Sequence, residues 1–410
     1  MAGSGKSGLL TCAGFPLRTA TGSCRPEPRE VRASAALVSV LLSLPRLELN
    51  GRPGTGHQGT LPIMRLFARL RPRGRPNPCV RLVVSACGSL RFALLVALLA
   101  TGCNERYWVC AAVDEAASGL VPRRLSETGL YEDRATDRMA GNVRSYRPQF
   151  PLWSDGAEKK RWVSLPDGSH IDTDDMDNWR FAAGTKFWKE FTRDGVRVET
   201  RLMAKVGAGD EDWVFMSYLW NADGTDAVAA PYGAIDARGT AHDVPAANEC
   251  ASCHRGRTSR VLGFSAIQLS ELSQVGEIAL ANLSDEGLTK SRVDRTFVVP
   301  GDDTERAALG YLHANCGDCH NQSRPSAAGP RCFEPRNELD LWLRTGALAS
   351  VEDTPTYQTV FDRFAERGHP DQSGIVRRIS QRGFGSMPCV GSERIDEEGV
   401  ALLRRWIAEL

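Results

Sequence analysis

Two copies of the pattern Cys-x-x-Cys-His constrain this chain more than any other feature. They are Cys250–His254 and Cys316–His320, and they begin 66 positions apart in a chain of 410 residues. In a c-type haem attachment site, two thiols add to the vinyl groups of the haem and the adjacent imidazole reaches the iron. The sequence therefore predicts two covalently attached haem c groups.

The competing interpretations of such a pattern are a zinc site and a dithiol redox pair. A zinc ribbon brings its cysteine pairs together at roughly 15–20 residues, whereas the offset here is 66. An export signal, described below, also favours haem, because c-type haem is attached outside the cytoplasm. The expected thioether-forming cysteines and proximal iron ligands are Cys250, Cys253, Cys316, Cys319, His254 and His320.

The two haem motifs differ in their candidates for the sixth iron ligand. Met387 lies in the loop Gly385-Ser-Met-Pro388 and is the last methionine of the chain. A thioether from a loop before the final helix is the usual distal ligand in this class, so we expect Met387 to bind the second haem iron. No methionine lies between His254 and Cys316, which leaves an open position or one of four candidates for the first haem: His242, His313, Met203 and Met216.

Two further cysteines follow the second haem motif, and one of them is close to this loop. Cys389 follows Met387 by two positions, and Cys332 precedes it in the same half of the chain. In an oxidising compartment these cysteines could pair. A disulfide between Cys332 and Cys389 would tether the ligand loop.

The first 102 residues differ in charge from the rest. They contain 14 Lys/Arg and 3 Asp/Glu, whereas residues 103–410 contain 37 Lys/Arg and 47 Asp/Glu. Near the end of this stretch, Arg81 and Arg91 precede the short apolar run Phe92–Ala100. A basic segment, a short apolar segment and small residues describe a secretory signal. The acidic body gives a nucleic-acid role no electrostatic support.

The signal ends in Leu99-Ala-Thr-Gly-Cys103, which resembles a bacterial lipobox. We expect cleavage before Cys103 and lipidation of Cys103, which places the protein on the periplasmic side of a bacterial membrane. Residues 1–63 are rich in Arg, Pro, Gly and Ser, and a signal peptide begins within about 30 residues of the start. We therefore expect translation to start at Met64 or closer to the apolar run, with residues 103–129 as a linker.

Residues 130–245 predict a β-rich, sandwich-like domain. Lys186–Phe191, Val196–Leu202 and Trp213–Trp220 alternate or form apolar runs, separated by turn signals such as Asp194-Gly195. A carbohydrate-like or quinone-like binding face is the alternative to a plain core. The span holds only two histidines, which argues against copper. Four acidic residues could bind calcium, although a solvated turn is favoured because the expected Gly is missing: Asp172, Asp174, Asp175 and Asp177.

The remaining chain predicts an α-helical cytochrome c-type region, so the expected fold is a multidomain α+β protein. Residues 246–300 carry the first haem motif and residues 301–410 the second. Thr304–Cys316 has helical apolar spacing and follows the N-cap candidates Asp302 and Asp303. A last helix opens at Asp396, with an apolar stripe at Val400, Leu403, Trp406, Ile407 and Leu410.

Several long segments resemble a family of exported bacterial dihaem c-type cytochromes. They are Phe150–Trp162, which contains Pro-Leu-Trp-Ser-Asp-Gly-Ala, together with Asp175–Trp179, Gly184–Phe191, Val261–Phe264 and Gly310–Cys316. The resemblance covers about residues 128–410. It implies two haems at the attachment residues above and electron transfer outside the cytoplasm.

Three functions are consistent with this pattern, one of which is a cytochrome subunit fused to a docking domain that serves a separate dehydrogenase. The other two are as follows. The first is an electron carrier that exchanges electrons with a redox partner protein or a membrane component. The second is a haem enzyme, peroxidase-like or another oxidoreductase, which would act at an open first haem. An acidic body would suit a basic redox partner.

Overall fold

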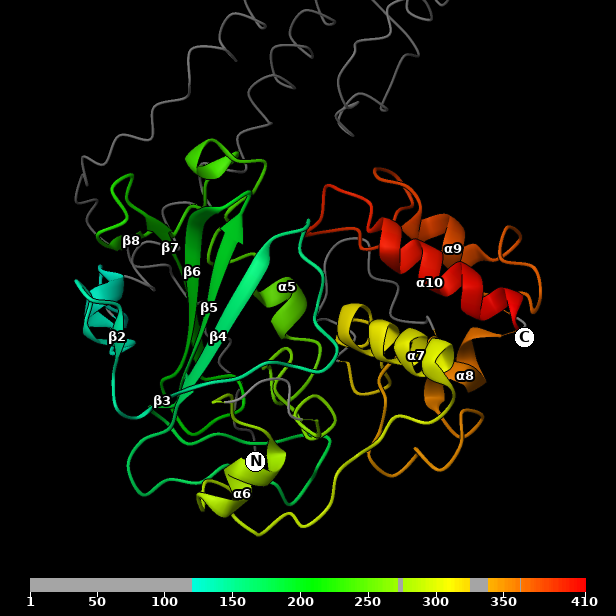
Figure 1. Ribbon diagram of the computed structural model, residues 1–410, viewed down its shortest axis with the longest axis horizontal. Coiled ribbons are helices and arrows are strands. Elements are labelled where there is room, and N and C mark those ends of the chain that lie inside the picture. Colours follow the sequence, from blue (N-terminus) through cyan, green and yellow to red (C-terminus); the bar gives the residue numbers. More distant parts are fainter. Residues whose placement is uncertain (1–119, 272–275, 325–337, 362) are drawn as a thin grey trace, which may run out of the picture. The chain divides into compact units, whose positions relative to one another are not determined.

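The computed structural model describes residues 120–271, 276–324, 338–361 and 363–410. All of them belong to one compact unit of mixed α+β structure, as expected (Figure 1). The expected leader, the lipidation residue Cys103 and the cysteine Cys332 lie outside the described residues.

A six-stranded antiparallel sheet forms one side of the unit, with its strands in chain order. Its strands are β3 (Val143–Ser145), β4 (Glu158–Ser164), β5 (Lys186–Arg193), β6 (Val196–Lys205), β7 (Trp213–Trp220) and β8 (Ala227–Ala229). The three strands predicted from alternation are β5, β6 and β7, so that prediction is confirmed.

Turn chemistry explains why β5 and β6 form a hairpin. Asp194 and Gly195 both have positive φ, at 50° and 76°. This is the backbone of a type I′ turn, whose twist matches the right-handed twist of paired strands. The dipeptide Asp-Gly is favoured there because both residues tolerate the left-handed region.

The expected sandwich is corrected by the strand pairing. Among the described residues, the only strands outside the sheet are β1 (Tyr131–Asp133) and β2 (Arg138–Met139), which form a separate two-stranded ribbon. Strands of two or three residues are too short to make a second layer. Instead, the segment before β3 covers one sheet face, where Leu125 and Leu130 pack in a cluster with Trp188. This segment includes the 3-10 turn η2 (Leu125–Glu127).

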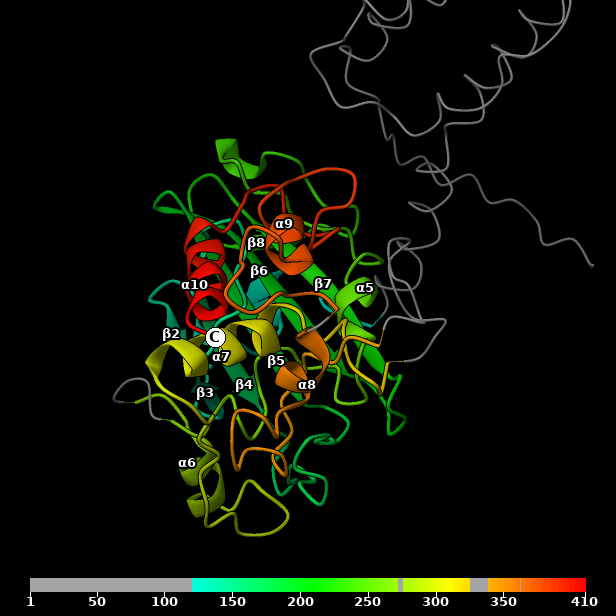
Figure 2. The same cartoon turned by 90° about the vertical axis from the view of Figure 1, so that its right-hand side faces the viewer.

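Most of the helices lie on the opposite side of the sheet, and the short helix Leu280–Asp285 lies beyond its β3 end (Figures 1 and 2). They are α5 (Ala251–His254), α6 (Leu280–Asp285), α7 (Asp303–Asn315), α8 (Pro355–Val360), α9 (Gly374–Ile379) and α10 (Glu397–Ala408), with a 3-10 turn η3 (Ala237–Gly239) after β8. None of the helices in the described part of the chain is long and apolar enough to cross a membrane.

Both predicted long helices are confirmed, together with their caps. The Asp302 carboxylate accepts a hydrogen bond from Glu305 N at 2.9 Å and starts α7. The Asp396 carboxylate accepts one from Gly399 N at 3.0 Å and starts α10. The expected stripe of α10 is buried as far as Ile407, whereas Leu410 follows the helix and is 37% exposed.

The helices and the inner sheet face share one hydrophobic core. Phe187 and Trp213 of the sheet belong to the same buried cluster as Leu309 of α7 and Trp406 of α10. This continuous core positions both Cys-x-x-Cys-His segments between the sheet and the helices.

Candidate functional site

The two Cys-x-x-Cys-His segments are connected through residues that follow each motif. Arg324 donates to the carbonyl oxygen of Ser252 in the first segment at 3.1 Å and to that of Asp318 in the second at 3.0 Å. Asn321 donates to the carbonyl oxygens of Gly256 at 3.3 Å and Asp318 at 3.1 Å. Segments 66 positions apart in sequence therefore form one site.

Gly256 makes this contact possible because it has no side chain. A Cβ built on Gly256 would overlap the carbonyl oxygen of Asp318. That oxygen belongs to the backbone, so a larger residue could be accommodated only if the two segments moved apart.

The imidazole of His254 is oriented for metal binding through one nitrogen. Its Nδ1 lies 2.7 Å from the carbonyl oxygen of Arg260, so Nδ1 carries the proton and donates it. The ring packs against Phe215, with ring centroids 4.8 Å apart. Burial lowers the pKa of His254 to about 3. The neutral ring therefore keeps a free lone pair on Nε2, as a metal-binding histidine requires.

The second segment begins where α7 ends. Cys316 is the C-cap of α7, and a Cβ on Gly317 would lie 2.6 Å from the His313 carbonyl oxygen and 2.9 Å from that of Leu341. The carbonyl oxygen of His320 accepts from Leu341 N at 2.8 Å. Burial, and then nearby arginines, lower the pKa of His320 to about 4, so this imidazole is also neutral.

All four motif cysteines are free thiols. Burial raises the pKa of Cys250 to about 11 and those of Cys316 and Cys319 to about 12, and it also raises the pKa of Cys253. Surroundings that activate a dithiol lower the pKa instead, so these four thiols are neutral.

Met387 lies between α9 and α10. Its backbone N–H donates to Arg378 O at 2.9 Å, and its side chain packs on the same core as Cys316. This placement is compatible with an axial role, which stays a prediction. Cys389 takes part in a disulfide, and its partner lies outside the described residues, so the pairing with Cys332 also stays a prediction.

Both histidines considered for the first haem are engaged by the protein. His242 is buried, and its Nε2 lies 2.8 Å from a carboxylate oxygen of Glu199, which leaves only Nδ1 for a metal. His313 is 1% exposed, and its Nδ1 accepts from Leu343 N at 3.1 Å. The proton of His313 is therefore on Nε2, which in this tautomer is a donor and not a ligand.

The two methionine candidates lie on opposite faces of the sheet. Met203 pairs with Phe215, whose ring contacts His254, and belongs to the inner core. Met216 points to the other face and packs in the outer cluster with Trp188. The first motif lies on the inner side, so only Met203 shares its face of the sheet.

Several carboxylates of the acidic turn after β4 are engaged by other groups of the protein. Lys290 forms ion pairs with Asp172 and Asp174, while Asp175 accepts from the backbone N–H of Asp177 at 3.0 Å. Among the described residues, no group of three His, Cys, Asp or Glu side chains could hold a metal ion.

A row of cations on the inner sheet face was not predicted from the sequence. Register places Arg161 of β4, Lys189 of β5 and Arg201 of β6 side by side, with Lys159 two residues before Arg161. Arg201 pairs with Glu199, with Nε at 3.0 Å from the carboxylate. The sequence contains one indication of this row. Lys189 lies at an inward position between Phe187 and Phe191, where an apolar residue is expected.

Comparison with known proteins gives no independent identification: no family model, no curated protein and no solved structure matches this chain.

Proposed function

We propose that this chain is an exported c-type cytochrome that carries two haem c groups and transfers electrons between redox partners. The observation that carries the proposal is the direct contact between the two attachment segments through Gly256, Asn321 and Arg324. Haem iron supplies a one-electron couple whose potential depends on its axial ligands, burial and hydrogen bonding. Residues that hold two such groups side by side would allow electrons to pass within the molecule.

Each residue has a specific part in this proposal. Cys250 and Cys253 would hold the first haem, and the hydrogen bond from His254 Nδ1 to Arg260 O would direct Nε2 to its iron and raise its basicity. The second haem would be held by Cys316 and Cys319, with His320 as the proximal ligand and Met387 as the distal ligand: these four residues lie in the segment after α7 and in the loop before α10. A Met/His pair raises the reduction potential.

The cellular setting follows from the sequence. A lipid on Cys103 would anchor the protein to a bacterial membrane on the periplasmic side, where c-type haem is attached. The excess of acidic residues in 103–410 would favour a basic redox partner. Electron transfer to such a partner would then slow as ionic strength rises.

The decisive experiment is production in a host that attaches c-type haem, followed by a pyridine haemochrome count and by optical and electron paramagnetic resonance spectra. We expect two haems per chain. Two low-spin haems that do not react with cyanide or peroxide would support a carrier. Fewer than two haems would contradict the proposal.

Met387→Ala tests the second haem separately. We expect its iron to become high-spin or hydroxide-ligated, because no thioether remains in that loop. Met139→Ala is the matched control, since Met139 packs in the cluster on the outer sheet face. A Met387→Ala spectrum identical to that of the parent protein would exclude Met387 as a ligand.

A second candidate function is a haem enzyme that acts at the first haem. The engagement of His242 by Glu199 and of His313 by Leu343 favours it, because each bond reduces the supply of sixth ligands. One high-spin, cyanide-accessible iron in the parent protein, with a second one added by Met387→Ala, would support this function. Conversion of the first haem from low-spin to high-spin by Met203→Leu would instead identify Met203 as its ligand.

A further inference from the structure

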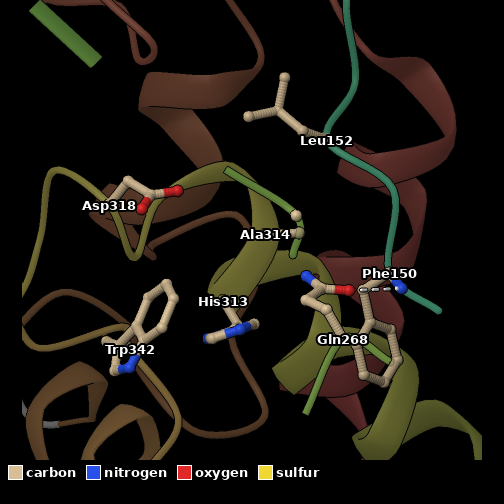
Figure 3. Close-up of a pocket in the computed structure, with 8 residues that line it drawn as sticks. Phe150, Leu152, Gln268, His313, Ala314, Asp318 and Trp342 are labelled. Atoms are coloured by element: carbon tan, nitrogen blue, oxygen red, sulfur yellow. Dashed lines mark hydrogen bonds between the residues drawn. The ribbon is translucent and has the colours of Figure 1, made fainter. Parts of the chain in front are cut away.

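The interior beside the two attachment segments is closely packed. The cavity there has room for about one water molecule, and Figure 3 shows His313 between Trp342 and Gln268 at its wall. A space of this size cannot hold a group from a redox partner, which therefore has to dock on the outer surface. One part of that surface is the loop between α9 and α10, which contains Met387, the proposed distal ligand of the second haem (Figure 1).

One side chain of this loop, Phe384, is fully exposed to solvent, whereas the next most exposed aromatic residue of the described chain, Tyr232, is 39% exposed. The Ser386 N–H donates to the Gly383 carbonyl oxygen at 3.2 Å, and Gly385 has a φ of 80°. These are the features of a type II turn with Phe384 at its second residue and glycine at its third. The backbone thus holds the ring in water, where an apolar group of this size is unfavourable.

The loop is held to the rest of the protein on both sides of Phe384. The Met387 N–H donates to the Arg378 carbonyl oxygen at 2.9 Å. Further along the loop, the Asp155 carboxylate accepts from the Ser392 hydroxyl at 2.8 Å and from the Arg394 N–H at 3.0 Å. The exposed ring therefore belongs to a preformed surface, and a partner that binds it need not first order the loop.

Arginine side chains lie around this exposed ring. Arg378 donates to the carbonyl oxygen of Gly385 at 3.2 Å, next to Phe384. Arg382 donates to the carbonyl oxygen of Met387 at 3.0 Å. These acceptors are neutral carbonyl oxygens, so both guanidinium charges stay available to a partner.

The charge of this loop is opposite to that of the body of the protein. Residues 377–395 contain four arginines and one acidic residue, Glu393, whereas residues 103–410 as a whole contain 37 Lys/Arg and 47 Asp/Glu. Arg394 is exposed, and its carbonyl oxygen accepts from Arg382 Nε at 2.6 Å, which brings these two arginines together. The acidic residues that follow belong to the cap and first turn of α10, whose dipole they complement: Asp396, Glu397 and Glu398.

We infer that this loop docks an acidic redox protein, through a surface made of one aromatic residue and three arginines: Phe384, Arg378, Arg382 and Arg394. The inference rests on the proposed function. Aromatic and arginine side chains are enriched at protein interfaces, and opposite charges steer two proteins together. Arg382 contacts Met387, and the charge of Arg378 acts on His320. A protein docked here would therefore lie next to both proposed ligands of the second haem, while the acidic body would serve a basic partner.

The first measurement uses the haem-loaded full chain and plastocyanin, a small acidic copper protein, as the electron acceptor. The second-order rate of electron transfer, measured by stopped flow, should fall as ionic strength rises. Phe384→Ala and Arg394→Glu should each lower the rate at low ionic strength by about tenfold or more.

Arg123→Glu and Ile235→Ala are the matched controls. They change an exposed arginine and an exposed apolar residue that lie outside this loop, so both should keep the parental rate. Parental rates in Phe384→Ala and Arg394→Glu, or equal losses in the two controls, would overturn the inference.

Spectra of the variants separate docking from an effect on the haem itself. The Phe384 side chain is exposed, so Phe384→Ala should leave the optical spectrum and the reduction potential of the second haem unchanged. A slower rate that is accompanied by altered ligation at Met387 would overturn the docking role.

Two other occupants of this surface give distinct results. A second copy of the chain would appear in sedimentation velocity as a dimer that Phe384→Ala dissociates. An anionic membrane would appear as flotation with phosphatidylcholine–phosphatidylglycerol vesicles that Arg394→Glu abolishes, measured in the Cys103→Ser protein, which lacks the proposed lipid. Either result would overturn the acidic redox protein as the occupant.

The haemochrome count separates this inference from the proposed function. Two haems with parental rates in both loop variants would refute the docking surface and leave the proposed function intact. Fewer than two haems would refute the proposed function, and calorimetry with redox-inactive, zinc-substituted plastocyanin would then test the surface alone. Binding that Phe384→Ala weakens would support the surface, and no binding by the parent protein would overturn it.

Discussion

At the scale of single residues, the geometry of the candidate site depends more on backbone contacts, and on which histidine nitrogen carries the proton, than on charge. Gly256 lets two distant segments touch, and the carbonyl of Arg260 holds the proton on Nδ1 of His254. The N–H of Leu343 does the opposite to His313 and leaves the proton on Nε2. Two neutral histidines near the same site are therefore suited to different tasks, one to bind a metal and one to donate a hydrogen bond.

Gly256→Ala should separate the two attachment segments. The added Cβ would overlap the Asp318 carbonyl oxygen, which cannot move without the backbone. In the proposed dihaem protein we expect both haems to be retained, with weaker magnetic interaction between them and at least tenfold slower electron transfer from one to the other. Electron paramagnetic resonance spectra of the oxidised protein measure the interaction, and flash-reduction kinetics measure the rate. Gly346→Ala is the control, because no atom lies within 4 Å of its Cβ position, and an equal effect there would contradict the contact.

The protonation of His313 predicts a dependence of stability on pH. Burial, and then Arg257, lower its folded pKa to about 3 from a usual value of 6.5. Between these two values the unfolded chain binds the proton more readily, so stability should fall as pH decreases from about 6.5 towards 3.

His313→Gln should lose less stability over this range, since its amide does not titrate and can still accept from Leu343 N–H. We expect the difference between the two proteins to change by about 2 kcal/mol between pH 7.5 and pH 4.5. Urea unfolding at both pH values gives this difference. Parallel losses in the two proteins would show that the pKa of His313 is the same in the folded and unfolded states.

At the scale of elements, α7 and α10 pack closely because of one glycine. A Cβ on Gly399 of α10 would overlap the Tyr311 ring of α7. Both helices begin at an aspartate cap, which sets the turn at which each side chain meets its neighbour. Small changes at this crossing should therefore alter the position of the second attachment segment.

Gly399→Ala should destabilise the protein although alanine favours helix formation. Overpacking costs typically 1–3 kcal/mol, while the gain in helix propensity is about 0.5–1 kcal/mol. We expect a net loss of about 1 kcal/mol in urea unfolding. Glu398→Ala, at an exposed position of the same turn, should change stability by less than about 0.5 kcal/mol. A more stable Gly399→Ala protein would show that the helices can move apart freely.

At the scale of the whole molecule, the sheet and the helices share one core. Residues of the inner sheet face belong to the same buried cluster as those of α7 and α10. The lysines of β4 and β5 also contact carbonyl oxygens of the segments that surround the attachment sites. The sheet therefore forms one wall of the candidate site.

The shared core predicts that the sheet and the helical region unfold together. Tryptophan fluorescence should report mainly on the sheet, which includes Trp162, Trp188, Trp213 and Trp220. Soret absorption of the haem-loaded protein should report on the attachment segments. We expect coincident transitions in guanidinium chloride. Two transitions separated in denaturant concentration would show that the two regions fold independently.

The features that could be predicted from residue order alone are those with a local cause. The attachment pattern places three reactive groups within five residues, and caps such as Asp302 act within one helical turn. Alternation along Lys186–Phe191 and the Asp194-Gly195 turn likewise depend on neighbours, so the strands and the hairpin were predictable. The sandwich was wrong because alternation shows that a strand has a buried face and does not say what covers it.

The remaining features depend on contacts between distant parts of the chain. The adjacency of the two attachment segments rests on Gly256 against Asp318, and the tautomer of His313 on the N–H of Leu343. Strand register brings Lys189 next to Arg161 and Arg201. No period or spacing encodes such pairs, because each depends on where the folded chain returns.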